Sequence, residues 1–223
     1  MLKVHSLKPF PCKCMYFLAL GLLVCSLAAT AASASTGAGA TEKGPDDWEE
    51  YWNSKQPPAK VMDALAIAPG MVVGEVGAGR GRYVVKMAER VGLTGKVYAN
   101  DIDEEALAYL DSRCERDSIP NVETVLGTVT DPRLPAAKLD LVYVINTYHH
   151  FEKPVELLRN IIPALKPEGR LVIIEHDPEK MSGGKHSTSQ QTVLGHTSRA
   201  GFELVGIETF LELDTIYILR VPN

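Results

Sequence analysis

Short apolar runs alternate with amphipathic stretches along most of the chain. The apolar runs cover residues 72–76, 96–101, 122–126, 138–145 and 171–174, and each has the length of a single strand. Stretches between them repeat apolar residues at helical spacing, as at Val84, Met87, Ala88 and Val91. Strands that alternate with helices predict right-handed βαβ crossovers and a parallel sheet.

The last part of the chain completes the pattern. Residues 152–165 predict a helix with a break near Pro163, and residues 189–200 predict a helix that Gly201 ends. Residues 202–210 and 215–221 predict two strands with only a short turn between them. Because no helix separates these strands, we expect an antiparallel hairpin at one edge of an α/β sheet.

A glycine-rich segment follows the first strand. Glu75 precedes Gly77, Gly79 and Gly81, which stand at every second position before the first helix. Glycine lets the chain turn sharply and lets a ligand approach the backbone. The dinucleotide fingerprint requires a third glycine at position 82, where this chain has arginine. A carboxylate also disfavours a pyrophosphate but suits an ammonium and a sulfonium group, so the motif favours S-adenosylmethionine over NAD.

Asp101 is the last residue of the second predicted strand and lies 24 positions after Gly77. A carboxylate at this place accepts hydrogen bonds from both ribose hydroxyls of a nucleotide. The acids at 103–105 open the next helix, where they favour the helix dipole without any further role.

Five segments together carry a family resemblance: residues 75–81, 97–103, 125–128, 139–142 with 146–150, and 165–171. With these segments the chain resembles the class I S-adenosylmethionine-dependent methyltransferases, in particular the small single-domain type related to the quinone-biosynthesis enzymes. The resemblance covers about residues 59–221. It implies a Rossmann-like, seven-stranded, mostly parallel sheet with helices on both faces and an antiparallel edge hairpin.

The resemblance also implies which residues hold the cofactor. Glu75 and the backbone of the glycine segment are expected at its amino-acid end, Asp101 at the ribose, and Ile102 at the adenine. The full set is Glu75, Gly77, Ala78, Gly79, Asp101, Ile102, Thr128 and Asn146, the last of which lines the methyl-donor site. Many relatives have an aspartate where Thr128 stands, so the contact at the adenine edge stays open, with Asp131 as an alternative.

A catalytic base is needed only where the acceptor must lose a proton. His149 and His150 follow the fourth strand, at the edge where substrates enter. An imidazole titrates near neutrality, so His149 is the candidate base, and the alternative is that the pair only packs or caps the loop. Residues 175–177 form a second candidate group. With His186 they match no metal-ligand spacing, so no metal site is predicted.

The N-terminal residues differ in character from the rest. Three lysines precede an apolar run over 15–29, and Ala-x-Ala sequences follow at 29–31 and 32–34. This pattern predicts a signal peptide over residues 1–34, cleaved near Ala34, and export to the periplasm or beyond. The alternatives are an uncleaved anchor and a downstream start that leaves the enzyme in the cytoplasm. The apolar run is short for a bilayer, so no stable span is expected in the mature chain.

Residues 35–58 are predicted to form a linker and an N-terminal arm, and residues 59–223 the methyltransferase domain. The arm carries Trp48 and Trp52. Their rings either shape a substrate pocket or only dock the arm on the domain.

The charge of the chain bears on its acceptor. The formal net charge is −5, and the leader holds three lysines and no acid, which leaves −8 for residues 35–223. Nucleic-acid binding depends on a basic surface, so a small-molecule acceptor is expected and no nucleic acid. The predicted function is methyl transfer from S-adenosylmethionine to a small molecule. The alternatives are a non-catalytic module that binds an adenosyl ligand and an NAD(P)-dependent oxidoreductase.

Overall fold

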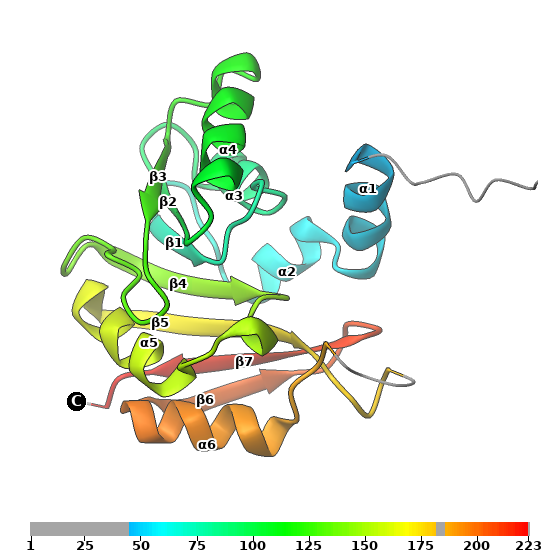
Figure 1. Ribbon diagram of the computed structural model, residues 1–223, viewed down its shortest axis with the longest axis vertical. Helices are drawn as coiled ribbons and strands as arrows, with labels where there is room; N and C mark the ends of the chain where they lie inside the picture. The colour runs from blue at the N-terminus through cyan, green and yellow to red at the C-terminus, as the bar shows by residue number, and fades with distance from the viewer. Residues whose placement is uncertain (1–44, 182–185, 223) are drawn as a thin grey trace, which may run out of the picture. The chain divides into compact units, whose positions relative to one another are not determined.

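The computed structural model describes residues 45–181 and 186–222, so the predicted signal peptide and most of the linker lie outside the described residues. The described part contains a seven-stranded sheet with the order β3-β2-β1-β4-β5-β7-β6 (Figure 1). The strands are β1 (Val72–Val76), β2 (Lys96–Asp101), β3 (Val122–Leu126), β4 (Leu139–Ile145), β5 (Leu165–His176), β6 (Glu203–Glu208) and β7 (Asp214–Arg220).

Helices precede, connect and follow these strands. They are α1 (Pro45–Lys55), α2 (Pro58–Ala64), α3 (Val84–Val91), α4 (Glu104–Arg116), α5 (Pro154–Ile161) and α6 (Gln190–Ala200), with the short 3₁₀ helices η1 (Tyr148–His150) and η2 (Ile162–Ala164). None of the helices in the described ranges has the combination of length and apolar character that crossing a bilayer requires.

The pairing of the strands confirms the predicted fold class. β1 pairs in parallel with β2 and β4, and the parallel pairs β2–β3 and β4–β5 extend the sheet on both sides. β7 runs antiparallel to both β5 and β6 and lies between them. The predicted hairpin is therefore present, with its second strand inserted next to β5 and its first strand at the edge.

Helices cover both faces of the sheet, as predicted. Successive side chains of a strand point to opposite faces, so Tyr143 and Val144 of β4 enter different cores. The core on one face includes apolar residues of α2, α3 and α4, such as Met87 and Leu110. The core on the other face includes those of α5 and α6, such as Leu158. Both faces are thus buried, which explains the nearly continuous apolar runs of β4 and β5.

Local sequence sets most element boundaries. The Asp103 side chain accepts hydrogen bonds from the backbone N–H groups of Glu105 and Ala106, which caps α4. Gly201 ends α6 with φ 107°, a conformation that glycine adopts readily. The predicted break near Pro163 is confirmed, since α5 ends at Ile161 and η2 follows.

One strand is longer than its apolar run predicts. β5 begins at Leu165, six positions before the apolar run 171–174, because Leu165 pairs with Leu139 at the start of β4. The register then shifts between Leu139 and Leu141, and pairing resumes with Arg170 beside Leu141. The sequence did not predict this extension, because residues 166–169 interrupt the apolar pattern of the strand.

Candidate active site

The carboxyl ends of β1, β2, β4 and β5 meet at one edge of the sheet. β1 lies between β2 and β4. From β1 the chain adds β2 and β3 on one side of the sheet, and it then crosses over to add β4 on the other side of β1. Such a switch point is where open α/β sheets bind ligands. Two pockets lie there. The first, of about 320 Å³, has the size of a small-molecule site, and its lining includes Glu75, Gly79, Arg82, Asn146 and His149. The lining of the second includes Asp101, Ile102, Thr128 and Leu157.

The glycine segment forms the wall of the first pocket between β1 and α3. Gly77 and Gly79 have φ values of 81° and 52°. A Cβ on Gly77 would lie 2.2 Å from Cγ2 of Thr147, so this position accepts no side chain. A Cβ on Gly79 would meet no heavy atom within 4 Å, which leaves open space for a ligand against the backbone.

Glu75 is buried at the base of this pocket. Its side chain sits on β1, and its Oε2 atom has no hydrogen-bond partner among the described residues. Burial raises the pKa of its carboxyl to about 8, although the Tyr143 hydroxyl and the Arg82 guanidinium act in the opposite direction. A buried acceptor that lines a pocket and lacks a donor fits a cationic group of a ligand.

Asp101 holds the loops around the second pocket. Its Oδ2 atom accepts a hydrogen bond from the N–H of Gly79 at 2.7 Å. Its Oδ1 atom accepts from the N–H groups of Ile102 and Asp103 at 2.7 and 3.0 Å. Each carboxylate oxygen has two lone pairs, so Oδ2 keeps one for a ribose hydroxyl. Ile102 is 60% exposed beside it, as expected of a residue that covers an adenine.

Thr128 lines the second pocket, whereas Asp131 is not among the residues that line it. The Asp131 carbonyl accepts a hydrogen bond from the Thr128 N–H at 2.8 Å, and the Asp131 carboxylate accepts one from the N–H of Arg133. The Asp131 carboxylate is therefore used in its own turn, and of these two residues only Thr128 faces the pocket.

Asn146 connects the pocket to the N-terminal arm. Its φ of 52° is unusual outside glycine and occurs most often in asparagine and aspartate, particularly at functional sites. Its Oδ1 atom accepts a hydrogen bond from Nε2 of Gln56 at 2.9 Å. Gln56 is fully buried and accepts from the Arg82 guanidinium at 2.7 Å. The chain between α1 and α2 thus fixes two side chains that line the first pocket.

His149 and Glu175 form a hydrogen-bonded pair on the other side of this pocket. Nδ1 of His149 lies 2.7 Å from Oε1 of Glu175, whose side chain is fully buried. This contact fixes the imidazole ring and leaves Nε2 as its second functional atom. Burial, with His149 and His186 nearby, lowers the pKa of His150 below its usual value. The pair has the arrangement of an activating base and the group that orients it.

The aromatic arm contributes to the same pocket. Trp48 and Trp52 of α1 both line it, and the Trp52 ring stacks on His176 at a centroid distance of 5.0 Å. His176 in turn lies 2.7 Å from Oδ1 of the buried Asp214. Of the two alternatives for the arm, the pocket lining favours the first, since the rings reach the pocket.

Three residues of the site were not predicted from the sequence: Gln56, Arg82 and Thr147. Arg82 could have been proposed, because it stands where a dinucleotide fingerprint has glycine. Thr147 lies with its hydroxyl 3.1 Å from the Gly77 carbonyl oxygen. Gln56 gave no signal, because its role depends on where the arm folds back.

Residues 73–169 match the model of a family described as a methyltransferase domain. The chain is 29% identical over 112 residues to nocamycin O-methyltransferase of Saccharothrix syringae, covering 50% of this chain and 40% of that protein. It is 26% identical over 117 residues to demethylmenaquinone methyltransferase of Lactococcus lactis, covering 52% of this chain and 46% of that protein. The chain thus spans less than half the length of these two relatives.

A solved structure of an S-adenosylmethionine-dependent methyltransferase from Aquifex aeolicus superposes with a TM-score of 0.71 at 24% identity. The superposed region covers 79% of this chain and 98% of the Aquifex aeolicus chain. This is the methyltransferase fold. A second structure of this fold, the methyltransferase CalH in complex with S-adenosylhomocysteine, matches with a TM-score of 0.61 at 21% identity and covers 80% of this chain and 60% of its own. These superpositions confirm the predicted fold.

Proposed function

We propose that this protein transfers a methyl group from S-adenosylmethionine to a small-molecule acceptor. The observation that carries the proposal is the buried carboxyl of Glu75, which lines the first pocket without a hydrogen-bond donor for its Oε2 atom among the described residues. An amino-acid ammonium group stabilises the ionised form of such a carboxyl, whereas the pyrophosphate of NAD would disfavour it. The same observation supports the methyl-donor cofactor over the dinucleotide alternative.

The other predicted cofactor residues fit the same ligand. The open space at Gly79 accepts a ligand against the backbone, and Asp101, Ile102 and Thr128 all line the second pocket. Asn146 lines the first pocket, as Glu75 does. We therefore propose Glu75, Gly77, Ala78, Gly79, Asp101, Ile102, Thr128 and Asn146 as the cofactor site.

The cofactor supplies an electrophilic methyl group on a sulfonium, so the protein must mainly orient the acceptor and exclude water. Trp48 and Trp52 supply apolar cover on the arm side of the first pocket. His149, held by Glu175, is the residue proposed to activate the acceptor. Its position at the end of β4 puts it in the pocket that Glu75 and Asn146 also line.

Two observations support a small acceptor. The net charge of −8 over residues 35–223 disfavours a polyanionic substrate. The first pocket has the volume of a small-molecule site. Two relatives are named for nocamycin and for demethylmenaquinone, which is compatible with this proposal.

Calorimetric titration of the full chain with S-adenosylmethionine, S-adenosylhomocysteine and NAD tests the cofactor. We expect the first two to bind and NAD not to bind. Asp101→Ala should weaken binding by about 1–3 kcal/mol, the scale of a lost charged hydrogen bond. Asp131→Ala is the matched control, since that carboxylate is used in its own turn, and it should leave affinity unchanged.

Binding of NAD, or equal affinities in the wild type and Asp101→Ala, would contradict the proposal. Binding of S-adenosylmethionine without turnover on any acceptor of a broad screen would instead favour the non-catalytic module.

From the sequence pattern alone, we also propose that residues 1–34 direct export and are removed near Ala34. N-terminal sequencing of the native protein tests this. A mature N-terminus near Ser35 is expected, and an intact Met1 would favour the uncleaved anchor.

A further inference from the structure

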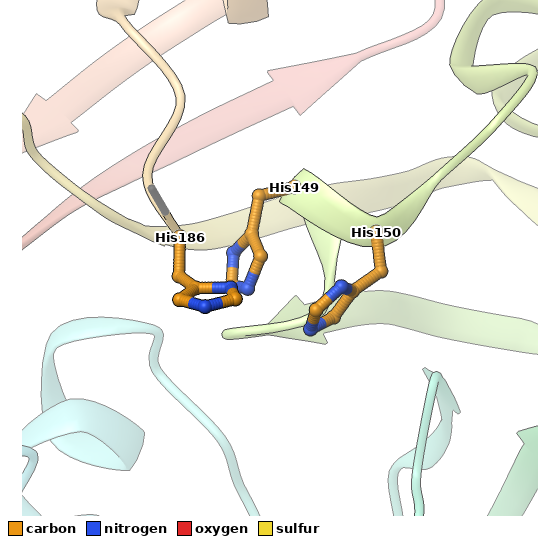
Figure 2. Close-up of side chains that lie close together, drawn as sticks. All are labelled: His149, His150 and His186. Carbon is orange, nitrogen blue, oxygen red and sulfur yellow. The ribbon is translucent and has the colours of Figure 1, made fainter. Parts of the chain in front are cut away.

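Three histidines from two separate segments converge at the first pocket. His149 and His150 belong to η1 after β4, and His186 follows β5 (Figure 2). One ligand nitrogen of each can be chosen so that all three lie within 4.8 Å of one another. The ring centroids of His149 and His150 are 4.1 Å apart, and that of His186 lies 5.6 and 5.9 Å from them. Spacing along the chain gave no reason to expect this group.

A buried carboxylate stands behind the group. Oε1 of Glu175 binds Nδ1 of His149 at 2.7 Å, so Nε2 is the atom of His149 that remains to bind a ligand. Metal-binding histidines commonly use their second nitrogen in this way, and the carboxylate orients the ring and raises its basicity. Oε2 of Glu175 is buried without a hydrogen-bond partner among the described residues. A cation bound to His149 would interact favourably with this buried carboxyl group.

The second neighbour of His149 is also held in place. The His176 ring stacks against it at 5.9 Å, and Nδ1 of His176 binds the buried Asp214 at 2.7 Å. The ring of His149 is therefore fixed by Glu175 and flanked by His176, whereas His150 and His186 are exposed. One fixed ligand and two adjustable ones suit a site that closes around an ion.

We propose that His149, His150 and His186 bind a divalent transition-metal ion, Zn²⁺ first among them, at the acceptor side of the pocket. Imidazole nitrogen is a preferred ligand of Zn²⁺, and three protein ligands with one open position are typical of catalytic zinc sites. Tetrahedral coordination at about 2.0–2.1 Å requires nitrogens about 3.3 Å apart. The atoms lie within 4.8 Å of one another in the structure, and the exposed rings of His150 and His186 have room to rotate toward the shorter spacing.

The role of the ion rests on the proposed function, although its binding does not. An acceptor hydroxyl or thiol at the open position would have its pKa lowered, as metal-bound water does. Its proton passes to water and its lone pair becomes available to the methyl group. The overall reaction then converts S-adenosylmethionine and X–H, where X is oxygen or sulfur, into S-adenosylhomocysteine, X–CH₃ and a proton. In this scheme His149 activates the acceptor as a ligand of the ion and does not itself accept the proton.

Metal titration tests the site without any methyl acceptor. The full chain, purified without a histidine tag and stripped with a chelator, is titrated with Zn²⁺, and bound zinc is counted by elemental analysis. Co²⁺ substitution gives an absorption spectrum that reports the ligand geometry. Cys12, Cys14 and Cys25 are further possible ligands, so the site is judged by the zinc equivalents that a variant loses.

We expect His186→Ala and His149→Ala each to lose one equivalent of zinc. His196→Ala should keep it, because His196 of α6 binds the Tyr148 hydroxyl and is not part of the cluster. Glu175→Gln should keep the site with about 10–100-fold weaker affinity. Equal zinc content and equal Co²⁺ spectra in the wild type and His186→Ala would overturn the proposal.

The two proposals fail separately. Histidine-dependent zinc binding without S-adenosylmethionine binding would leave the metal site and refute the proposed function. Methyl transfer by chelator-treated protein at the full rate would refute the role of the metal and leave the proposed function.

Discussion

At the scale of single residues, Glu75 combines a buried carboxyl with a position in the pocket lining. This residue of β1 is only 4% exposed, and none of the described residues donates a hydrogen bond to its Oε2 atom. Without a cation nearby, burial keeps the carboxyl protonated up to a pKa of about 8. An ammonium group beside it would favour the charged form. Ligand binding and proton release are therefore linked at this position.

At pH 7, binding of S-adenosylmethionine should release about one proton, because the ligand lowers the Glu75 pKa from above the ambient pH to below it. Calorimetry in two buffers of different ionisation enthalpy measures the number of protons released. Glu75→Gln is the matched control, because it keeps the side-chain shape and cannot titrate. Equal proton release by the wild type and the variant would show that another group is responsible.

Site residues differ in how visible they are in the sequence. Glu75 and Asp101 could be assigned because each stands at a fixed place relative to a strand end and a glycine motif. Gln56 and Glu175 act through partners 90 and 26 positions away, and no local pattern encodes such contacts. The sequence did not decide whether Thr128 or Asp131 contacts the adenine. The structure favours Thr128, because Thr128 lines the second pocket and the Asp131 carboxylate accepts a hydrogen bond from the N–H of Arg133.

At the scale of elements, the turn between β1 and α3 is shaped by two glycines with positive φ and different surroundings. Gly77 packs closely against Thr147, which follows β4, whereas no heavy atom would lie within 4 Å of a Cβ on Gly79. The first glycine therefore serves packing between two strand ends, and the second serves the ligand. The sequence motif alone does not distinguish these two roles.

Gly77→Ala should destabilise the protein by about 2–5 kcal/mol, the sum of left-handed backbone strain and a clash with Thr147. Gly79→Ala should cost only about 1–2 kcal/mol of stability but should weaken cofactor binding, since its methyl group enters the pocket. Urea unfolding and calorimetry measure the two effects.

Gly195→Ala provides a control for these glycine variants. Gly195 lies within α6, and a methyl group added there would meet no heavy atom within 4 Å, so this change should stabilise by about 0.5–1 kcal/mol. A Gly77→Ala variant as stable as the wild type would contradict the packing role.

At the scale of the whole molecule, the site combines segments that are far apart in the chain. The first pocket takes lining residues from α1, from the segments after β1 and β4, and from β5. A ligand that contacts all of these stabilises the folded state only, because the unfolded chain has no pocket. Its effect is therefore visible in global unfolding.

S-adenosylhomocysteine at 100 times its dissociation constant should raise the melting temperature by about 5–10 °C, from about 2.7 kcal/mol of linkage and 2–4 °C per kcal/mol. NAD at the same concentration should leave the melting temperature unchanged. Differential scanning fluorimetry makes the comparison, and Asp101→Ala should reduce the shift. Stabilisation by NAD alone would favour the oxidoreductase alternative.

The sequence by itself determined the order of strands and helices, the parallel sheet with its terminal hairpin, and the strand-end motifs. These depend on hydrophobic periodicity, on glycine and proline, and on acids at strand ends, which are properties of short segments. The position of α1 over the pocket, the Arg82–Gln56–Asn146 contacts and the early start of β5 came only from the structure. So did the gathering of His149, His150 and His186. These features depend on distances between segments that the chain brings together only when it packs, and no local pattern records those distances.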